Sequence, residues 1–138
     1  MYSVVFDTVV FVRSLINPHG IWGQLVFEHA ASYWLILSKP VAQQVLHRPE
    51  LTRRFRSLAH MDTQRVISLR KQAESVEVRT VPALSRDPND NKFLATAAAG
   101  NADYLVSEDE DLLILKQYKG VRIVDAQSLL RVLMQAPR

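Results

Sequence analysis

Short, almost uninterrupted runs of apolar and β-branched residues recur along this chain, and they constrain its fold more than any other feature. Residues 3–6 and 104–106 are such runs, and both end where acidic or polar residues begin. Strands that are buried on both faces have this pattern, whereas half-exposed strands alternate. Stretches with helical spacing of apolar residues lie between the runs. This alternation predicts an α/β protein whose parallel sheet is covered by helices on both faces.

The remaining elements are expected at positions marked by caps, turn residues and apolar spacing. Besides the two apolar runs, we expect strands at 34–37, 76–81 and 121–124. Helices are expected at 9–16, 22–33, 39–47, 51–58, 63–75, 90–99 and 112–117, and a last helix is expected from 125 through 134. Ser38, Asp62 and Asp125 are the expected caps of the helices at 39–47, at 63–75 and at the C-terminal end.

The chain's size and composition suit one domain, residues 1–138, with one core: it has 138 residues, of which 48% are hydrophobic. No apolar run reaches the ~18 residues that span a bilayer, and the N-terminus lacks the features of a signal peptide, so no membrane association is expected. The absence of cysteine excludes disulfides and thiolate metal sites and fits the cytoplasm. A net charge of +3 is compatible with a polyanionic partner but equally with an ordinary soluble protein.

Acidic residues fall at the ends of the predicted strands. Asp7 follows the first run, Asp109 and Asp111 follow residues 104–106, and Asp90 begins the alanine-rich helix. Binding sites of parallel sheets form at the carboxyl ends of the strands, so these acids are candidates for one site. Gathered carboxylates repel each other unless a cation neutralises them, and Mg²⁺ or Mn²⁺ prefers such oxygen ligands.

Each acid also has a structural interpretation. Asp90 and Asp62 suit helix N-caps, and residues 109–111 suit a solvated loop. For any single acid this interpretation is the stronger one. Asp7, directly after a buried strand, is the hardest to explain in this way. The four histidines show no metal-ligand spacing. The tryptophans at 22 and 34 are expected in the core.

The order of several motifs resembles the PIN-domain family, and in particular its VapC-like subgroup of toxins from toxin–antitoxin systems. The resemblance rests on the N-terminal strand followed by Asp7, on DPNDNKFLATA at 87–97, on ADYLVSEDEDLL at 102–113, on VLHRPEL at 45–51, and on VRIV at 121–124 before a helix. Together these motifs cover nearly the whole chain in the family's order.

This resemblance implies a three-layer α/β/α sandwich with a central parallel sheet, and a Mg²⁺- or Mn²⁺-dependent ribonuclease. Carried over by motif, Asp7, Asp90 and Asp109 are the catalytic metal ligands and Asp111 is an additional one. Asp87 belongs to the motif but is less securely a ligand. The resemblance further implies an RNA substrate, an antitoxin protein encoded nearby and a homodimer.

Two departures from the family bear on activity. The family's Asp-Thr-Asn after the first strand is Asp7-Thr8-Val9 here, and valine cannot replace the hydrogen bonds of asparagine. The family's glutamate on the helix after the second strand is missing, and counting back from residues 45–46 places Val41 at its position. Gln43 or Gln44 offers only a neutral oxygen there. These departures predict a weakened metal site.

Three hypotheses remain open from the sequence. The first is a PIN-domain endoribonuclease toxin with weakened activity. The second is a catalytically impaired PIN fold that binds RNA or a protein. The third is a metal-dependent phosphatase or another hydrolase on a similar sheet. Basic residues between 48 and 71 could line an RNA path or form a solvated helix face, and the apolar faces of 51–58 and 63–75 could pack in a dimer.

Overall fold

A predominantly parallel sheet forms the centre of the protein. The computed structural model describes residues 1–41, 73–79, 81–84 and 90–135, and within them the strand order is β3-β2-β1-β4-β6-β5. Every neighbouring pair is parallel except β5 and β6, which form an antiparallel hairpin. The strands are β1 (Tyr2–Phe6), β2 (Tyr33–Ser38), β3 (Glu74–Val76), β4 (Tyr104–Val106), β5 (Gln117–Tyr118) and β6 (Val121–Val124). The predicted parallel sheet is confirmed, with a short antiparallel strand added at one edge.

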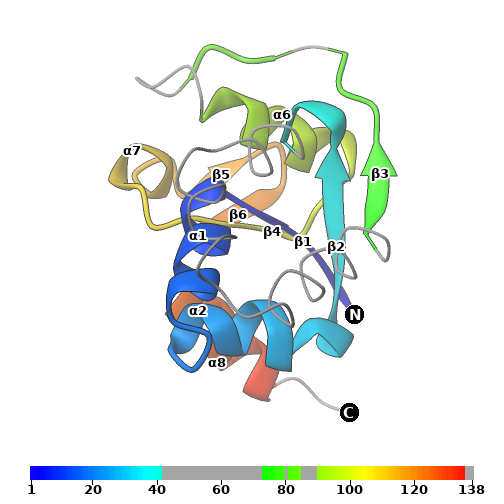
Figure 1. The fold of residues 1–138 in the computed structure, drawn as a ribbon. Coiled ribbons are helices and arrows are strands. Elements are labelled where there is room, and N and C mark those ends of the chain that lie inside the picture. Colours follow the sequence, from blue (N-terminus) through cyan, green and yellow to red (C-terminus); the bar gives the residue numbers. More distant parts are fainter. Residues whose placement is uncertain (42–72, 80, 85–89, 136–138) are drawn as a thin grey trace.

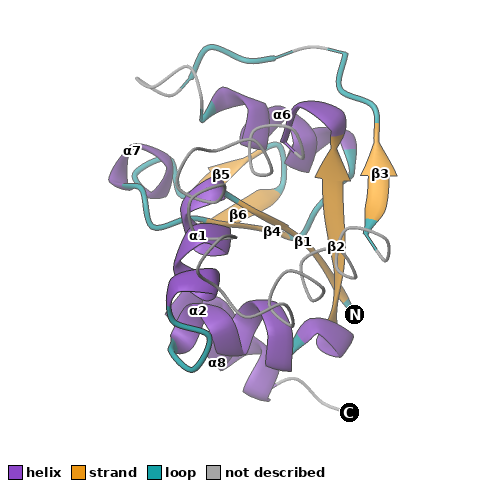
Figure 2. Cartoon of the chain, viewed as in Figure 1, coloured by secondary structure: helices purple, strands orange, loops and turns teal. Residues whose placement is uncertain are grey.

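Helices cover both faces of this sheet (Figure 1; Figure 2). Helix α6 (Asn91–Ala99) packs on one face, over β1, β2 and β4. Helices α1 (Thr8–Ile16), α2 (Ile21–Gly23) and α8 (Ala126–Gln135) gather on the other face. Helix α7 (Glu110–Leu113) lies beyond the end of β4. The predicted three-layer α/β/α sandwich is confirmed.

The core forms where β1 runs through the middle of the molecule. Val4, Val5 and Phe6 are completely buried, so both faces of the strand are covered, as its uninterrupted apolar sequence predicts. The Phe6 ring meets Phe11 of α1 and Tyr33 of β2 edge-to-face, with ring centroids 5.5 and 5.4 Å apart. Aromatic pairs favour this geometry. The packing fixes the end of β1, where the first candidate acid lies.

The predicted helix at 22–33 is wrong in its second half. Helix α2 gives way to a π-helix at Gln24–Glu28 and a 3-10 turn at Ala30–Ser32, and β2 begins at Tyr33. The buried Tyr33 hydroxyl donates hydrogen bonds of 3.0 Å to the carbonyls of Leu25 and Val26. These carbonyls lie at a helix end, where intrahelical partners run out. The helical spacing of apolar residues therefore extends to Tyr33 in the sequence, although in the structure Tyr33 is already the first residue of β2.

Other boundaries also differ. Strand β3 occupies Glu74–Val76, so the predicted helix extends too far at 74–75 and the predicted strand at 76–81 lies too late. Helix α7 ends at Leu113, and Gln117 belongs to β5 rather than to a helix. Trp34 is 56% exposed and therefore does not belong to the core, contrary to expectation. Several predictions lie outside the described residues: the helix at 51–58, residues 63–72 of the helix at 63–75, residues 42–47 of the helix at 39–47, the cap Asp62, the motif residue Asp87, the glutamines at 43 and 44 and the basic residues at 48–71.

Two predicted caps are confirmed. The Asp125 carboxylate accepts a 2.8 Å hydrogen bond from the backbone N–H of Ser128 at the start of α8. A side-chain hydrogen bond with Ser128, followed by this backbone bond, holds the pKa of Asp125 below its usual value. Ser38 Oγ accepts from the backbone N–H of Val41 at 3.3 Å, which is N-capping geometry. No helix within the described ranges is long and apolar enough to cross a membrane.

Candidate metal centre

The loop after β4 supplies two of the candidate acids. Asp109 is the N-cap of α7, and its Oδ1 accepts a 2.9 Å hydrogen bond from the backbone N–H of Asp111. Because Asp111 lies within the first turn of α7, both carboxylates project from one short segment. The positive end of a helix favours negative charge, so this position helps to tolerate them.

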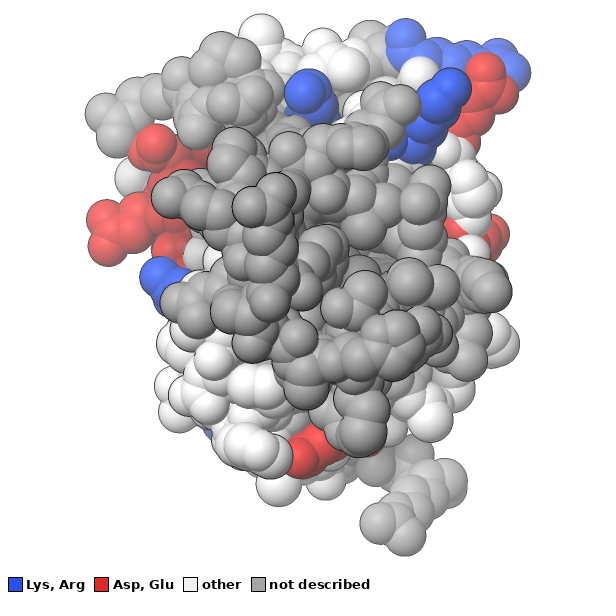
Figure 3. Space-filling view, in the orientation of Figure 1, with Lys and Arg blue, Asp and Glu red and all other residues white. Residues whose placement is uncertain are grey.

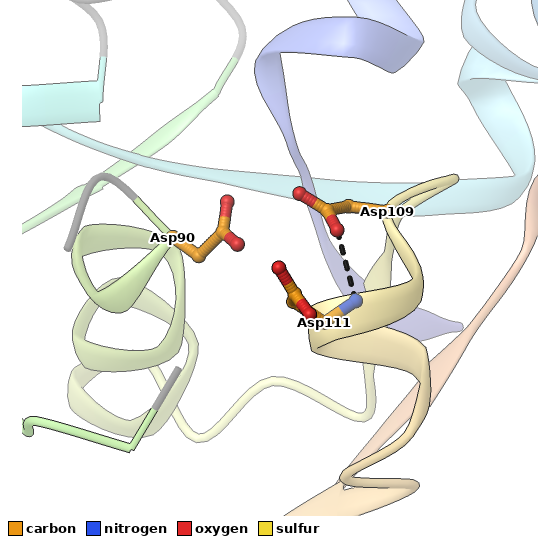
Figure 4. A group of neighbouring side chains, drawn as sticks. All are labelled: Asp90, Asp109 and Asp111. Atoms are coloured by element: carbon orange, nitrogen blue, oxygen red, sulfur yellow. Dashed lines mark hydrogen bonds between the residues drawn. The ribbon is translucent and has the colours of Figure 1, made fainter. Parts of the chain in front are cut away.

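Asp90 brings the third carboxylate from a separate element. It immediately precedes α6 and is only 7% exposed. Asp90 occupies the N-cap position of α6, as expected, but its side chain makes no capping hydrogen bond, so capping does not account for its carboxylate. One carboxylate oxygen from each of Asp90, Asp109 and Asp111 lies within 4.8 Å of the others. Figure 4 shows the Asp90 carboxylate facing the other two across the space between α6 and α7.

Asp7 lies at the carboxyl end of β1 but is not part of this group of three. Its Oδ1 accepts a 3.0 Å hydrogen bond from the backbone N–H of Val10, so Asp7 caps α1. Its Oδ2 accepts a hydrogen bond from Ser107 Oγ, directly after β4. Burial raises the pKa of Asp7 to about 6, against the lowering effect of these two hydrogen bonds; nearby Asp109 and Glu108 raise it further. Asp7, like Asp109 and Asp125, thus makes the side-chain capping bond that Asp90 lacks.

Ser107 connects the first acid to the group of three, and sequence reasoning did not single it out. This completely buried serine donates to Asp7 and accepts a 2.9 Å hydrogen bond from the backbone N–H of Asp109. The ends of β1 and β4 are therefore held together by polar groups at the edge of the sheet where the acids lie. The signal available in the sequence was a hydroxyl residue directly after a buried strand.

Glu108 was also missed, and it fixes the same loop from the other side. Its Oε1 accepts from Trp22 Nε1 at 3.1 Å and from the backbone N–H of Ala126 at 3.0 Å. The guanidinium of Arg13 lies 4.8 Å from the centre of the Trp22 ring, within cation–π range. Glu108 thus ties the loop that carries Asp109 to α2 and α8. These hydrogen bonds give Glu108 a structural role.

The three clustered carboxylates suit a hard divalent cation. In octahedral coordination of Mg²⁺ opposite ligands lie about 4.2 Å apart and adjacent ligands about 2.9 Å apart, so the oxygens of Asp90, Asp109 and Asp111, which lie within 4.8 Å of one another, would move closer together around one ion. The donor set is entirely oxygen, as Mg²⁺ and Mn²⁺ prefer. In Figure 3 acidic side chains gather at the side of the molecule where Figure 1 shows α7.

The structure describes both positions where the chain departs from the family's pattern, Val9 and Val41. Val9 occupies the first turn of α1 and is half-buried. Val41, at the expected position of the missing glutamate, is completely buried in the core. Its backbone N–H bonds Ser38, whose hydroxyl contacts that of Thr96 in α6 at 2.7 Å. An acid at position 41 would therefore enter a closed site next to α6, the helix that begins at Asp90.

Comparison with known proteins agrees with this arrangement. The model of the family described as "PIN domain" matches residues 3–111, and the chain therefore belongs to the PIN-domain family. Comparison with curated protein sequences gives no match.

Among solved structures, the chain is similar to a chain in the crystal structure of VapBC2 from Rickettsia felis bound to a DNA fragment from the promoter of that system. The TM-score is 0.50 at 14% sequence identity, and the match covers 88% of this chain and 96% of the other. At this identity the likeness shows the fold.

Proposed function

We propose that this protein is a divalent-metal-dependent endoribonuclease that acts in the cytoplasm as the toxin of a toxin–antitoxin pair. The observation that carries the proposal is the approach of Asp90, Asp109 and Asp111 to within 4.8 Å of one another at the ends of the sheet strands. Membership of the PIN-domain family supports the nuclease chemistry.

The three clustered acids would hold Mg²⁺ or Mn²⁺, and Asp7 would add charge at the same edge of the sheet. A bound ion of this kind stabilises the charge that develops on a phosphodiester and lowers the pKa of a bound water. The chain's contribution is to fix the acids: Asp109 is held by its bond from Asp111 N–H, and its own N–H is held by Ser107. Fixed ligands reduce the reorganisation needed during the reaction.

The similarity to VapBC2 supports the toxin assignment. That structure contains a toxin–antitoxin complex on promoter DNA. By analogy, we propose that the present chain pairs with an antitoxin protein encoded nearby and assembles as a dimer. Co-purification with the product of an adjacent small gene, followed by measurement of the complex mass, tests this part of the proposal.

A second function follows if the site binds metal too weakly to cut. Two observations favour it: the position of the missing glutamate is filled by the buried Val41, and both oxygens of Asp7 accept hydrogen bonds. In this case the protein is an impaired PIN fold that binds RNA or a protein partner.

RNA cleavage distinguishes the two functions. The purified protein is incubated with single-stranded RNA in Mn²⁺, in Mg²⁺ and in EDTA. The ribonuclease predicts cleavage that requires metal and that falls by at least about 100-fold in Asp109→Asn, which keeps the side chain's shape and removes its charge. Glu110→Gln is the matched control, because Glu110 is an exposed acid of α7 outside the group of three. Cleavage that survives EDTA, or that is equal in both variants, would exclude this metal centre.

A further inference from the structure

A groove of about 400 Å³ lies along α6, on a part of the surface that the candidate metal centre does not use. Its floor is the small side chains of Ala95, Ala98 and Ala99. One wall is the segment that follows β3, and the other is the turn of the β5–β6 hairpin, with Tyr118 and Lys119. Because alanine side chains are short, a ligand backbone can approach the helix closely along this floor.

Helix α6 connects the groove to the acids, because it follows Asp90 and carries the alanines of the floor. Helix α6 starts next to Asp90, and Ala95 follows five residues later, about 7.5 Å along the helix axis. Asp109 and Asp111 begin α7, and the chain then continues into β5 and the hairpin turn. The acids next to the start of α6 and the groove along the same helix are therefore close enough for one strand of nucleic acid to contact both.

Two cations flank the groove. The exposed side chains of Arg79, after β3, and Lys119, in the hairpin turn, both line it, and Glu77 is the one acid among the lining residues that the structure describes. The hairpin turn holds Lys119 and Gly120 at φ of 48° and 84°, the left-handed pair of a two-residue type I′ turn. This tight turn presents Lys119 and the half-buried Tyr118 in a defined position, with the Lys119 ammonium 5.5 Å from the centre of the Tyr118 ring.

We propose that this groove binds a single-stranded RNA segment next to the bond that is cut. In this arrangement phosphates lie near Arg79 and Lys119, and a base packs against the ring of Tyr118. Cationic side chains beside an aromatic ring are the combination that binds single strands without sequence preference. The proposal rests on the ribonuclease function and adds to it a location for the substrate outside the metal centre.

An acidic peptide is the competing ligand, and the lining residues favour RNA. Phosphates and carboxylates would pair equally well with the two cations, but the Tyr118 ring beside Lys119 suits a base, which has a flat face of its own. The volume of about 400 Å³ lies within the range of small-ligand pockets, which suits a short segment of a strand rather than a folded partner.

The test measures RNA binding without cleavage. Affinity of the 138-residue protein for a labelled short oligouridine is measured in EDTA by fluorescence anisotropy over a range of salt concentrations. Arg79→Gln and Lys119→Gln should each lower the slope of log affinity against log salt by about 0.7, the value for one lost phosphate contact to a single strand. Tyr118→Leu should weaken binding by about fivefold or more, whereas Tyr118→Phe, which keeps the ring, should bind normally.

The control for charge is Arg131→Gln, an exposed arginine of α8, which lies far from α6 in Figure 1. Unchanged slopes in Arg79→Gln and Lys119→Gln, or an equal change in Arg131→Gln, would overturn the proposal. So would unchanged RNA affinity combined with lost binding of polyglutamate, which would assign the groove to a protein partner. If metal-dependent cleavage persists in these cases, only the location of the substrate is wrong; if cleavage is absent but the groove variants lose RNA, only the ribonuclease function is wrong.

Discussion

Replacing Asp7 by asparagine should make the metal-free protein more stable at neutral pH. The folded protein buries this carboxylate, and burial raises its pKa from 3.8 to about 6. Above pH 6 the folded state must therefore carry a charge that has lost its hydration. Asparagine keeps an oxygen that can accept the hydrogen bond from Val10 N–H, and it removes the charge. The substitution thus relieves a cost without deleting the helix cap.

The magnitude follows from the two pKa values of Asp7. The difference between 3.8 and about 6 corresponds to about 3 kcal/mol. Between these values the folded chain binds more protons than the unfolded chain, so stability falls as pH rises from about 4 to 6 and stays low above 6. Asp7→Asn should therefore gain up to about 3 kcal/mol at pH 7.5, or roughly 10 °C in Tm, and almost nothing at pH 4.

Thermal and urea unfolding in EDTA at the two pH values measure this difference. The matched control is Asp125→Asn, the same chemical change at a carboxyl group whose pKa is lowered. Asp125 stabilises the fold above its unfolded pKa, and this contribution is lost as pH falls through the lower folded value, so its replacement should give no gain at pH 7.5. The reasoning is refuted if Asp7→Asn gains nothing at pH 7.5, or gains as much at pH 4.

Three further substitutions test the packing around the site. Val41→Glu puts an acid into a completely buried position. Calorimetry should then show tighter Mn²⁺ binding, while urea unfolding of the metal-free protein should show a loss of about 3–5 kcal/mol in the free energy of unfolding. Unchanged Mn²⁺ affinity would place the missing glutamate elsewhere. Thr96→Val removes the hydroxyl contact to Ser38 and should cost about 1–2 kcal/mol by the same unfolding measurement, and a neutral result would show that this contact contributes nothing. Gly23→Ala would place its Cβ 2.0 Å from the carbonyl oxygen of Pro18, so thermal unfolding should show a loss of at least about 3 kcal/mol, and wild-type stability would contradict this close approach.

The parts of the fold that follow from local sequence signals were predictable. Uninterrupted apolar runs identified β1 and β4 because both of their faces are buried. The alanine-rich stretch identified α6, and Asp125 identified the start of α8 through its capping geometry. Each of these signals depends on contacts that the segment makes in any α/β sandwich, so the pattern in the sequence is sufficient.

The parts that depend on contacts between distant segments were not predictable. Tyr33 belongs to β2 although it continues the helical spacing before it, because its hydroxyl reaches back to the carbonyls of Leu25 and Val26. Strand β5 has only two residues and exists through its pairing with β6. Neither feature has a signature in its own residues.

The candidate site divides in the same way. Its acids follow from the strand-end positions and from the resemblance to PIN domains. The sequence does not show which of these acids lie next to one another. Asp7 and Ser107, for example, are 100 residues apart, and only the folded chain shows their hydrogen bond. That bond, together with the cap on α1, distinguishes Asp7 from the three acids that face one another.

Calorimetric titration of the metal-free protein with Mn²⁺ tests the proposed metal centre most directly. We predict saturable binding that weakens by at least about tenfold in both Asp109→Asn and Asp111→Asn, a loss of about 1.4 kcal/mol or more. Glu110→Gln, which removes the acid between them, should bind as the unmodified protein does, since Glu110 lies outside the group of three. Absence of Mn²⁺ binding in the unmodified protein, or equal affinity in all of these variants, would contradict a metal centre built from Asp90, Asp109 and Asp111.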